Sequence, residues 1–200
     1  MGIASGTWDA GPWRDSLSHY GRIVHVCVEF AIAQNEDQIF PYDGDFFGVF
    51  ERSFVIAAFS IRRLAEKRLL TDSLNERKWS VTSYPASDKV RPPLPGSTSN
   101  EFYRGYRFDK RSADDLTLKE FGNEVIHSSN LGIVTEPEGV SCGIVVASDH
   151  RLSRRLLHVT VDDWATMCSA VLEDRVYIAS DDWDPITGKT TAKRLGRADI

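Results

Sequence analysis

An asparagine and a histidine lie four residues apart near the middle of the chain, at Asn123 and His127. The unperturbed pKa of histidine lies close to neutral, so its side chain can take up and release a proton near pH 7. On a helix, residues four apart share one face, and Glu120 falls on that face one turn earlier. These three residues are the candidate catalytic residues, with His127 at the centre. The alternative interpretation is a solvated helix face that carries an ordinary exposed histidine.

A capping box predicts the helix that holds these residues. In segment 117–120, the Thr117 oxygen can accept the amide of Glu120, whose carboxylate can reach back to the threonine amide. The helix, expected over 118–129, has an apolar face opposite the candidate residues, made of Leu118, Phe121, Val125 and Ile126. The candidate face carries short hydrogen-bonding groups rather than long charged side chains. We therefore expect a partner, and specifically a homodimer through the 118–129 helix, to cover it.

Two segments resemble the helical core of the HEPN superfamily: "IRRLAEK", in a long helix, and "GNEVIHSS", which contains the candidate residues. Those domains are helical bundles, and many are RNA-cutting toxins or defence effectors. Active members carry an arginine, then a polar residue, then a histidine a turn later, paired across a homodimer cleft. The resemblance implies that Asn123 and His127 fill the last two positions, while Gly122 stands in the arginine position. It covers about half of the chain, and the stretch after Leu131 lies outside such a bundle. The "N-x-x-I-H-S" helix is also similar to bacterial proteins of uncharacterised function.

Arginines outside the helix are candidates for nucleic-acid binding. Metal-free RNA cleavage needs cations to stabilise the charge that develops on phosphate, and Arg62, Arg63 and Arg151 are the candidates. The alternative is that these basic clusters are solvated faces. The net charge of −5, from 24 basic and 29 acidic residues, argues against nucleic-acid binding over the whole surface. A local basic cleft is compatible with this balance.

Other chemistries find little support in the sequence. The three cysteines (Cys27, Cys142 and Cys168) are far apart and form no C-x-x-C, which is typical of reduced thiols in a cytoplasmic protein. No histidine pairs with a cysteine at zinc-ligand spacing, so we expect neither a metal nor a cofactor. The aspartates of segment 181–184 indicate an acidic turn, because too little chain follows for an α/β phosphotransfer domain. The chain has no P-loop, G-x-G-x-x-G or G-x-S-x-G motif.

Apolar periodicity predicts a single α+β domain over 1–200. We expect an N-terminal helical layer with a long central buried helix, and a C-terminal small, mainly antiparallel sheet with one packed helix. The expected parts are a helical part over 13–72 and 117–130, a surface loop over 85–100, a strand-rich part over 131–184 and a fraying tail over 185–200.

Within these parts, helices are expected over 13–34 and 44–70, the latter capped by Asp43 or Asp45, and a later helix is capped by Asp162 or Asp163. The expected strands cover 78–84, 102–108, 133–135, 140–147, 156–161 and 175–179. Segments 133–135 and 140–147 form a hairpin around 136–139, and 140–147 pairs antiparallel with 156–161. The expected core consists of Val24, Cys27, Phe50, Phe54, Ala58, Ile61, Phe121, Val125, Ile144 and Trp164.

The sequence leaves two functional hypotheses. The first is a non-enzymatic interaction module or complex subunit with a protein partner, favoured by glycine in the arginine position. The second is a HEPN-like RNA-binding protein or metal-independent ribonuclease that uses His127. No apolar run approaches about 18 residues and no basic-then-apolar leader is visible, so we expect a cytoplasmic protein with no membrane partner.

Overall fold

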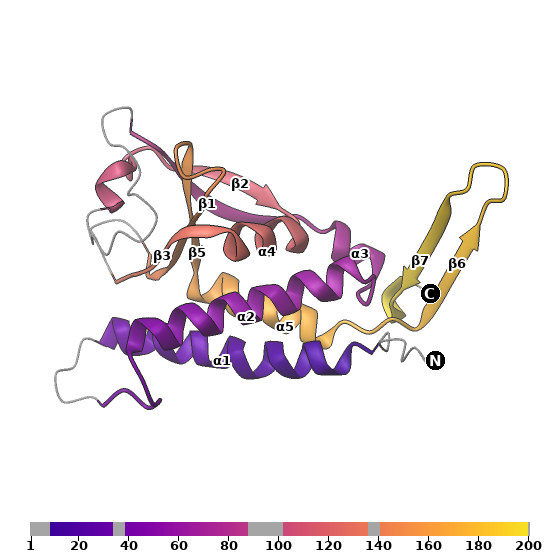
Figure 1. Ribbon diagram of the computed structural model, residues 1–200, viewed down its shortest axis with the longest axis horizontal. Helices are drawn as coiled ribbons and strands as arrows, with labels where there is room; N and C mark the ends of the chain where they lie inside the picture. The colour runs from indigo at the N-terminus through magenta and orange to yellow at the C-terminus, as the bar shows by residue number, and fades with distance from the viewer. Residues whose placement is uncertain (1–8, 34–38, 88–101, 136–140, 200) are drawn as a thin grey trace, which may run out of the picture.

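Helices and an antiparallel sheet together form an α+β structure, as expected (Figure 1). The computed structural model describes residues 9–33, 39–87, 102–135 and 141–199. The expected turn at 136–139, and most of the expected loop over 85–100, lie outside these residues. No helix in the described ranges has the length and hydropathy needed to cross a membrane.

Two long helices and two shorter ones make up the helical layer: α1 (Gly11–Ala33), α2 (Phe46–Glu66), α4 (Leu118–Ile126) and α5 (Val161–Glu173). Helix α2 starts at Asp45, whose carboxylate accepts the Gly48 amide at 2.9 Å, as one of the two expected caps. It ends four residues before the expected position. Arg68 takes a left-handed φ of 53°, and the Leu69 amide donates back to the Leu64 carbonyl at 2.9 Å. A single turn, α3 (Asp72–Glu76), follows.

The sheet is antiparallel throughout, with five strands in the order β2-β1-β5-β4-β3. In chain order the strands are β1 (Trp79–Pro85), β2 (Ser112–Leu116), β3 (Ser128–Val134), β4 (Gly143–Ser148) and β5 (Arg155–Thr160). The expected hairpin between 133–135 and 140–147 is the β3–β4 pair. The expected pairing of 140–147 with 156–161 is the β4–β5 pair, in which Ile144 lies opposite Val159.

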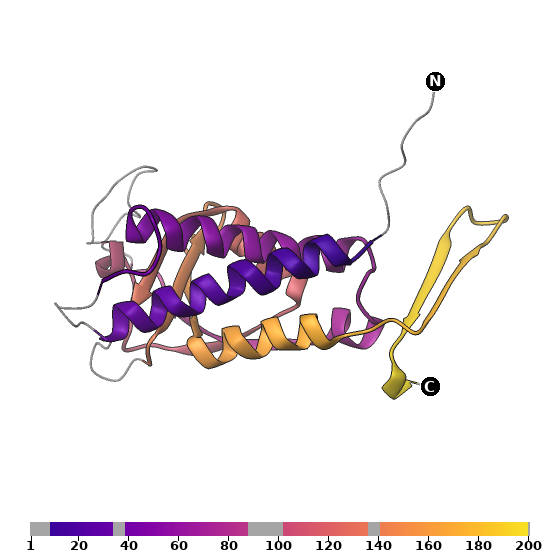
Figure 2. The ribbon, with the colours of Figure 1, turned by 90° about the horizontal axis from the view of Figure 1, so that it is seen from below.

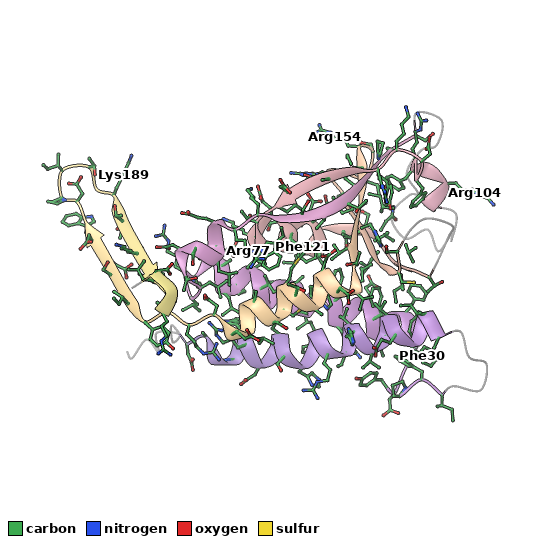
Figure 3. The ribbon with its side chains drawn as sticks, turned by 180° about the vertical axis from the view of Figure 1, so that it is seen from behind. Phe30, Arg77, Arg104, Phe121, Arg154 and Lys189 are labelled. Carbon is green, nitrogen blue, oxygen red and sulfur yellow. The ribbon has the colours of Figure 1, made fainter. Side chains whose placement is uncertain are left out.

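The helices cover one face of the sheet. Helix α4 lies between the sheet and α2, while α1 packs against both α2 and α5 (Figures 1 and 2). All ten expected core residues are buried, and all belong to one cluster. At its centre the Phe54 ring lies 5.0 Å from that of Trp164 and 6.2 Å from that of Phe121. Figure 3 shows Phe121 inside the molecule, between the helices and the sheet.

Two local expectations are wrong, and two elements were not expected. Segment 102–108 is not a strand but a 3-10 helix, Phe102–Gly105, followed by an isolated bridge from Tyr106 to Ala86. The buried Tyr106 hydroxyl donates to the Leu152 carbonyl at 2.8 Å, which fixes this segment against the second face of the sheet. The cap of α5 is Thr160 rather than Asp162 or Asp163, because its hydroxyl accepts the Asp163 amide. Strand β2 and helix α3 were not expected at all.

The C-terminal expectations are also wrong. Instead of a strand over 175–179 and a fraying tail, β6 (Ile178–Trp183) and β7 (Thr190–Leu195) form a separate two-stranded ribbon. Asp184 organises the turn between them: its carboxylate accepts the Thr187 hydroxyl at 2.6 Å and the Ile186 amide at 2.8 Å. The ribbon projects from the body of the molecule (Figures 1 and 2), and we call it the arm.

Truncating Phe54 tests the position of the core. We expect Phe54→Ala to lower the free energy of unfolding by about 3–5 kcal/mol, because the ring is fully buried. Phe47→Ala, at a ring on the same helix that is 51% exposed, should cost much less. Urea unfolding of both variants measures the difference. A loss below about 1 kcal/mol for Phe54→Ala would contradict the assigned core.

Candidate functional site

The capping box that starts α4 is present. The Thr117 hydroxyl accepts the Glu120 amide at 3.2 Å, and the Glu120 carboxylate accepts the Thr117 amide at 2.8 Å. The helix ends at Ile126, earlier than expected, with His127 as its C-cap. Ser128 and Ser129 belong to β3 rather than to the helix, because pairing with β4 starts at Ser128.

The Glu120 carboxylate is occupied by contacts that stabilise the start of α4. Its carboxylate binds the Thr117 amide and hydroxyl and, at 3.0 Å, the Lys78 ammonium. These hydrogen bonds, that of the Thr117 amide first, lower the pKa of Glu120 to about 2, so it remains ionised at neutral pH. It also lies in the first turn of α4, whereas His127 caps the other end, about 10 Å away along the axis. The two residues share a helix face but cannot meet at one substrate atom.

Asn123 and His127 lie closer together, at the end of α4 nearest β3. The His127 side chain is exposed, and its backbone carbonyl accepts the Asp149 amide at 2.9 Å. Asn123 is half-buried, and its Oδ1 is fully buried with no hydrogen-bond partner among the described residues. An unpaired buried oxygen of this kind costs free energy, so it marks the position as unusual.

The three candidate arginines do not gather around His127. Arg62 pairs with Glu66 at 2.9 Å, and the Arg63 guanidinium lies 5.7 Å from the ring centre of Trp13. Two of them lie against α4: Arg62 packs beside Gly122, and the Nε of Arg151 is 3.1 Å from a carboxylate oxygen of Glu124. The structure therefore places Arg62 and Arg151 against α4, each already in an ion pair, and Arg63 beside Trp13.

Glu124 is not among the site residues predicted from the sequence, although this residue makes most of the polar contacts at this end of α4. It is only 6% exposed, accepts the Ser148 hydroxyl at 2.6 Å and pairs with Arg151 and with Arg155 at 3.3 Å. Arg155 in turn contacts Asp114 of β2. The position of Glu124 next to the expected core residue Val125 could have indicated a buried carboxylate. The partners of Glu124, however, come from segments that lie well beyond α4 in the sequence. The network ties α4 to strands β2, β4 and β5, so it holds Arg151 in a structural ion pair.

Gly122 marks the closest approach of α4 to α2. A Cβ atom at this position would lie 2.9 Å from the Arg62 Cβ and 3.1 Å from the Ala58 carbonyl oxygen. Such distances leave no space for any larger side chain. The arginine position implied by the HEPN resemblance is therefore occupied by the residue type that the helix crossing requires.

The arm is a second candidate site that was missed in the sequence. Four large apolar side chains on or beside it are exposed, Ile186 by 92%, Trp183 by 65%, Tyr177 by 61% and Ile178 by 42%. At its base, the Arg194 amide donates to Asp72 at 2.8 Å and its guanidinium binds both oxygens of Asp181. The segment D-P-I-T-G between two β-prone stretches was the available signal for a hairpin.

Neither site contains a metal-binding arrangement: across the described ranges, no three His, Cys, Asp or Glu side chains are grouped so that they could hold an ion. Comparison of the chain with family models, curated proteins and solved structures finds no match. Function must therefore be inferred from the geometry of this molecule alone.

Substitution of Gly122 tests the helix crossing. Alanine favours a helix by about 1 kcal/mol over glycine, but here its methyl group would overlap α2, which costs about 1–3 kcal/mol. We expect Gly122→Ala to lower the midpoint of thermal unfolding. Gly48→Ala is the matched control, since its nearest neighbour would be the Asp45 carboxylate at 3.5 Å and no clash arises. A Gly122→Ala protein as stable as the control would show that the helices can separate freely.

Proposed function

We propose that the protein is a non-enzymatic, cytoplasmic interaction module, a subunit of a complex that docks through its arm. The observation that carries the proposal is the exposure of large apolar side chains on a ribbon that projects from the body. An isolated two-stranded ribbon is marginally stable in water. Large apolar side chains exposed on a projecting ribbon favour an interaction surface. The dispersed arginines and the structural position of Glu120 speak against a catalytic centre on α4.

The partner that we propose is a second copy of the chain. Within the described residues β6 pairs only with β7, which leaves its other edge available. One face of the arm carries Ile178 and Asp182 on β6, and Lys193 and Leu195 on β7. Asp182 and Lys193 form no ion pair among the described residues. We propose that the arms of two copies stack through this face, related by a two-fold axis parallel to the strands. In that arrangement β6 of each copy, with Asp182, lies over β7 of the other, with Lys193, so opposite charges meet.

A dimer through the 118–129 helix is the competing arrangement. The outward face of α4 is polar, with exposed Lys119, Glu120 and His127. It lacks the apolar side chains that the arm presents, and Glu120 is already bound by Lys78. The arm therefore fits a self-associating surface better, because Asp182 of one copy can pair with Lys193 of the other, whereas Glu120 on α4 is already bound.

Charge reversal on the arm tests this proposal. In sedimentation velocity at micromolar concentration, we expect the wild-type chain at about twice its monomer mass of 22.5 kDa. Asp182→Lys and Lys193→Asp should each be monomeric, because each places like charges opposite one another. An equimolar mixture of the two variants should form a dimer again. In the mixed dimer the lysines of the Asp182→Lys copy face the aspartates of the Lys193→Asp copy.

The matched control is His127→Ala, on the polar face of α4, which should leave the dimer intact. A wild-type protein that stays monomeric would overturn the proposal. A dimer that dissociates in His127→Ala and not in the arm variants would instead support assembly through α4.

A second candidate function follows from the buried, unpartnered Oδ1 of Asn123 beside exposed His127. It supports a HEPN-like role in RNA binding or metal-independent cleavage, in which His127 exchanges a proton with the attacking 2′-hydroxyl. Arg62 and Arg151 are the candidate cations beside α4, although they are paired with Glu66 and Glu124.

His127→Ala tests this second function. If the protein cleaves RNA, the substitution should abolish cleavage of single-stranded RNA in the presence of EDTA. The melting temperature should change little, because the side chain is exposed. Wild-type protein that leaves varied RNAs intact, or a variant that cleaves as fast as wild type, would remove His127 from any such role.

A further inference from the structure

A cavity of about 570 Å³ is lined by residues from the start of α1, the end of α2, the segment after α5 and the base of the arm. Figures 1 and 2 show these segments side by side where the arm joins the body. Five basic side chains line the cavity: Arg14, Lys67, Arg68, Arg175 and Arg194. A neighbouring cavity of about 450 Å³ shares three of them and runs between the end of α2 and the arm. The volume lies within the range of about 300–1,000 Å³ that is typical of ligand sites.

The positive charge in this cavity is not balanced by nearby carboxylates. Arg194 is paired with Asp181 at 2.8 Å. Among the described residues, the other four cations have no carboxylate within ion-pair distance. Asp174, whose charge acts on Arg14, is hydrogen-bonded to the amide and hydroxyl of Thr71, and Glu66 beside the neighbouring cavity is paired with Arg62. Such a concentration of cations is unusual in a chain with a net charge of −5, and it attracts anions.

Two of the guanidinium groups are held close together by the backbone. Arg14 donates to the carbonyls of Val171 at 2.7 Å and Leu172 at 3.2 Å, and Arg175 donates to the same Leu172 carbonyl. Burial, and then the charge of Arg175, lower the pKa of Arg14. These carbonyls occupy only part of the five N–H donors that each guanidinium carries. The groups are therefore positioned in advance and retain donors for a further acceptor.

We propose that this cavity binds the phosphate group of a phosphate ester. A phosphate offers several acceptor oxygens and up to two negative charges, which guanidinium groups bind through paired hydrogen bonds. The phosphate would meet Arg14 and Arg175 from the body and Lys67 and Arg68 from the end of α2. This phosphate site lies at the base of the arm, on the face opposite Asp182 and Lys193. Binding there is therefore independent of the proposed dimer contact.

The same chemistry is present in free organic phosphates and in a nucleic-acid backbone, so the experiment includes both. Binding of pyrophosphate, ATP and a single-stranded RNA 10-mer is measured by isothermal titration calorimetry in phosphate-free buffer. The test variant is the double substitution Lys67→Gln and Arg68→Asn. Both side chains are exposed, and asparagine tolerates the left-handed φ at position 68. The matched control is Arg22→Gln with Arg52→Gln, which removes the same charge from exposed positions outside the cavity.

We expect at least one probe to bind and the double variant to weaken it about tenfold or more, with the control unchanged. Circular dichroism and the melting temperature of each variant confirm that it is folded, and Arg175→Gln provides a second variant in the same cavity. Binding of ATP would identify a free phosphate ester, with binding of pyrophosphate showing that the phosphate groups alone suffice, and binding of the 10-mer alone would identify a nucleic-acid backbone. The proposal is overturned if no probe binds to the wild-type protein, or if both cavity variants bind as tightly as the control.

Discussion

The close crossing of α4 over α2 is the constraint on which most of this structure depends. Among the described residues, α4 lies between α2 and the sheet and contacts both, so its distance from α2 sets how closely α2 approaches the sheet. Gly122 allows the two backbones to approach until Ala58 and Arg62 touch α4. That approach brings the Phe121 ring against the touching rings of Phe54 and Trp164, so that aromatic groups from three helices form the centre of the core.

The polar network around Glu124 complements this apolar contact. Packing against α2 fixes one side of α4, but it does not fix how the helix is rotated or placed along the sheet. Glu124 does so through directional bonds to Ser148 on β4 and Arg155 on β5. A buried carboxylate must keep such partners, because an unpaired buried charge costs several kcal/mol. The apolar crossing therefore provides most of the stability of this layer, and the network specifies its register.

Much of the architecture could be predicted because the relevant signals are local. Helical periodicity located α1 and α2, the Thr117–Glu120 capping box located the start of α4, and apolar strands predicted the β3–β4–β5 pairing. The missed features depend on contacts between distant residues. Ser128 leaves the helix because Ser148 offers strand pairing, and the partners of Glu124 become visible only when the sheet is assembled. The arm has few apolar side chains facing the body, so its polar sequence resembles that of a free tail.

The arm, unlike the body, can change its length in evolution without disturbing the packing of the core. The described contacts tie the arm to the body near its base, where Arg194 binds Asp72 and Arg68 and Gly196 lies against Thr71. Side chains in a ribbon alternate between its faces, so inserting two residues in each strand preserves both faces and lengthens the arm by about 7 Å. Pairs of inserted or deleted residues would thus change its reach in fixed steps and leave the core packing unaltered. The distance between a partner and the body can therefore evolve separately from the stability of the fold.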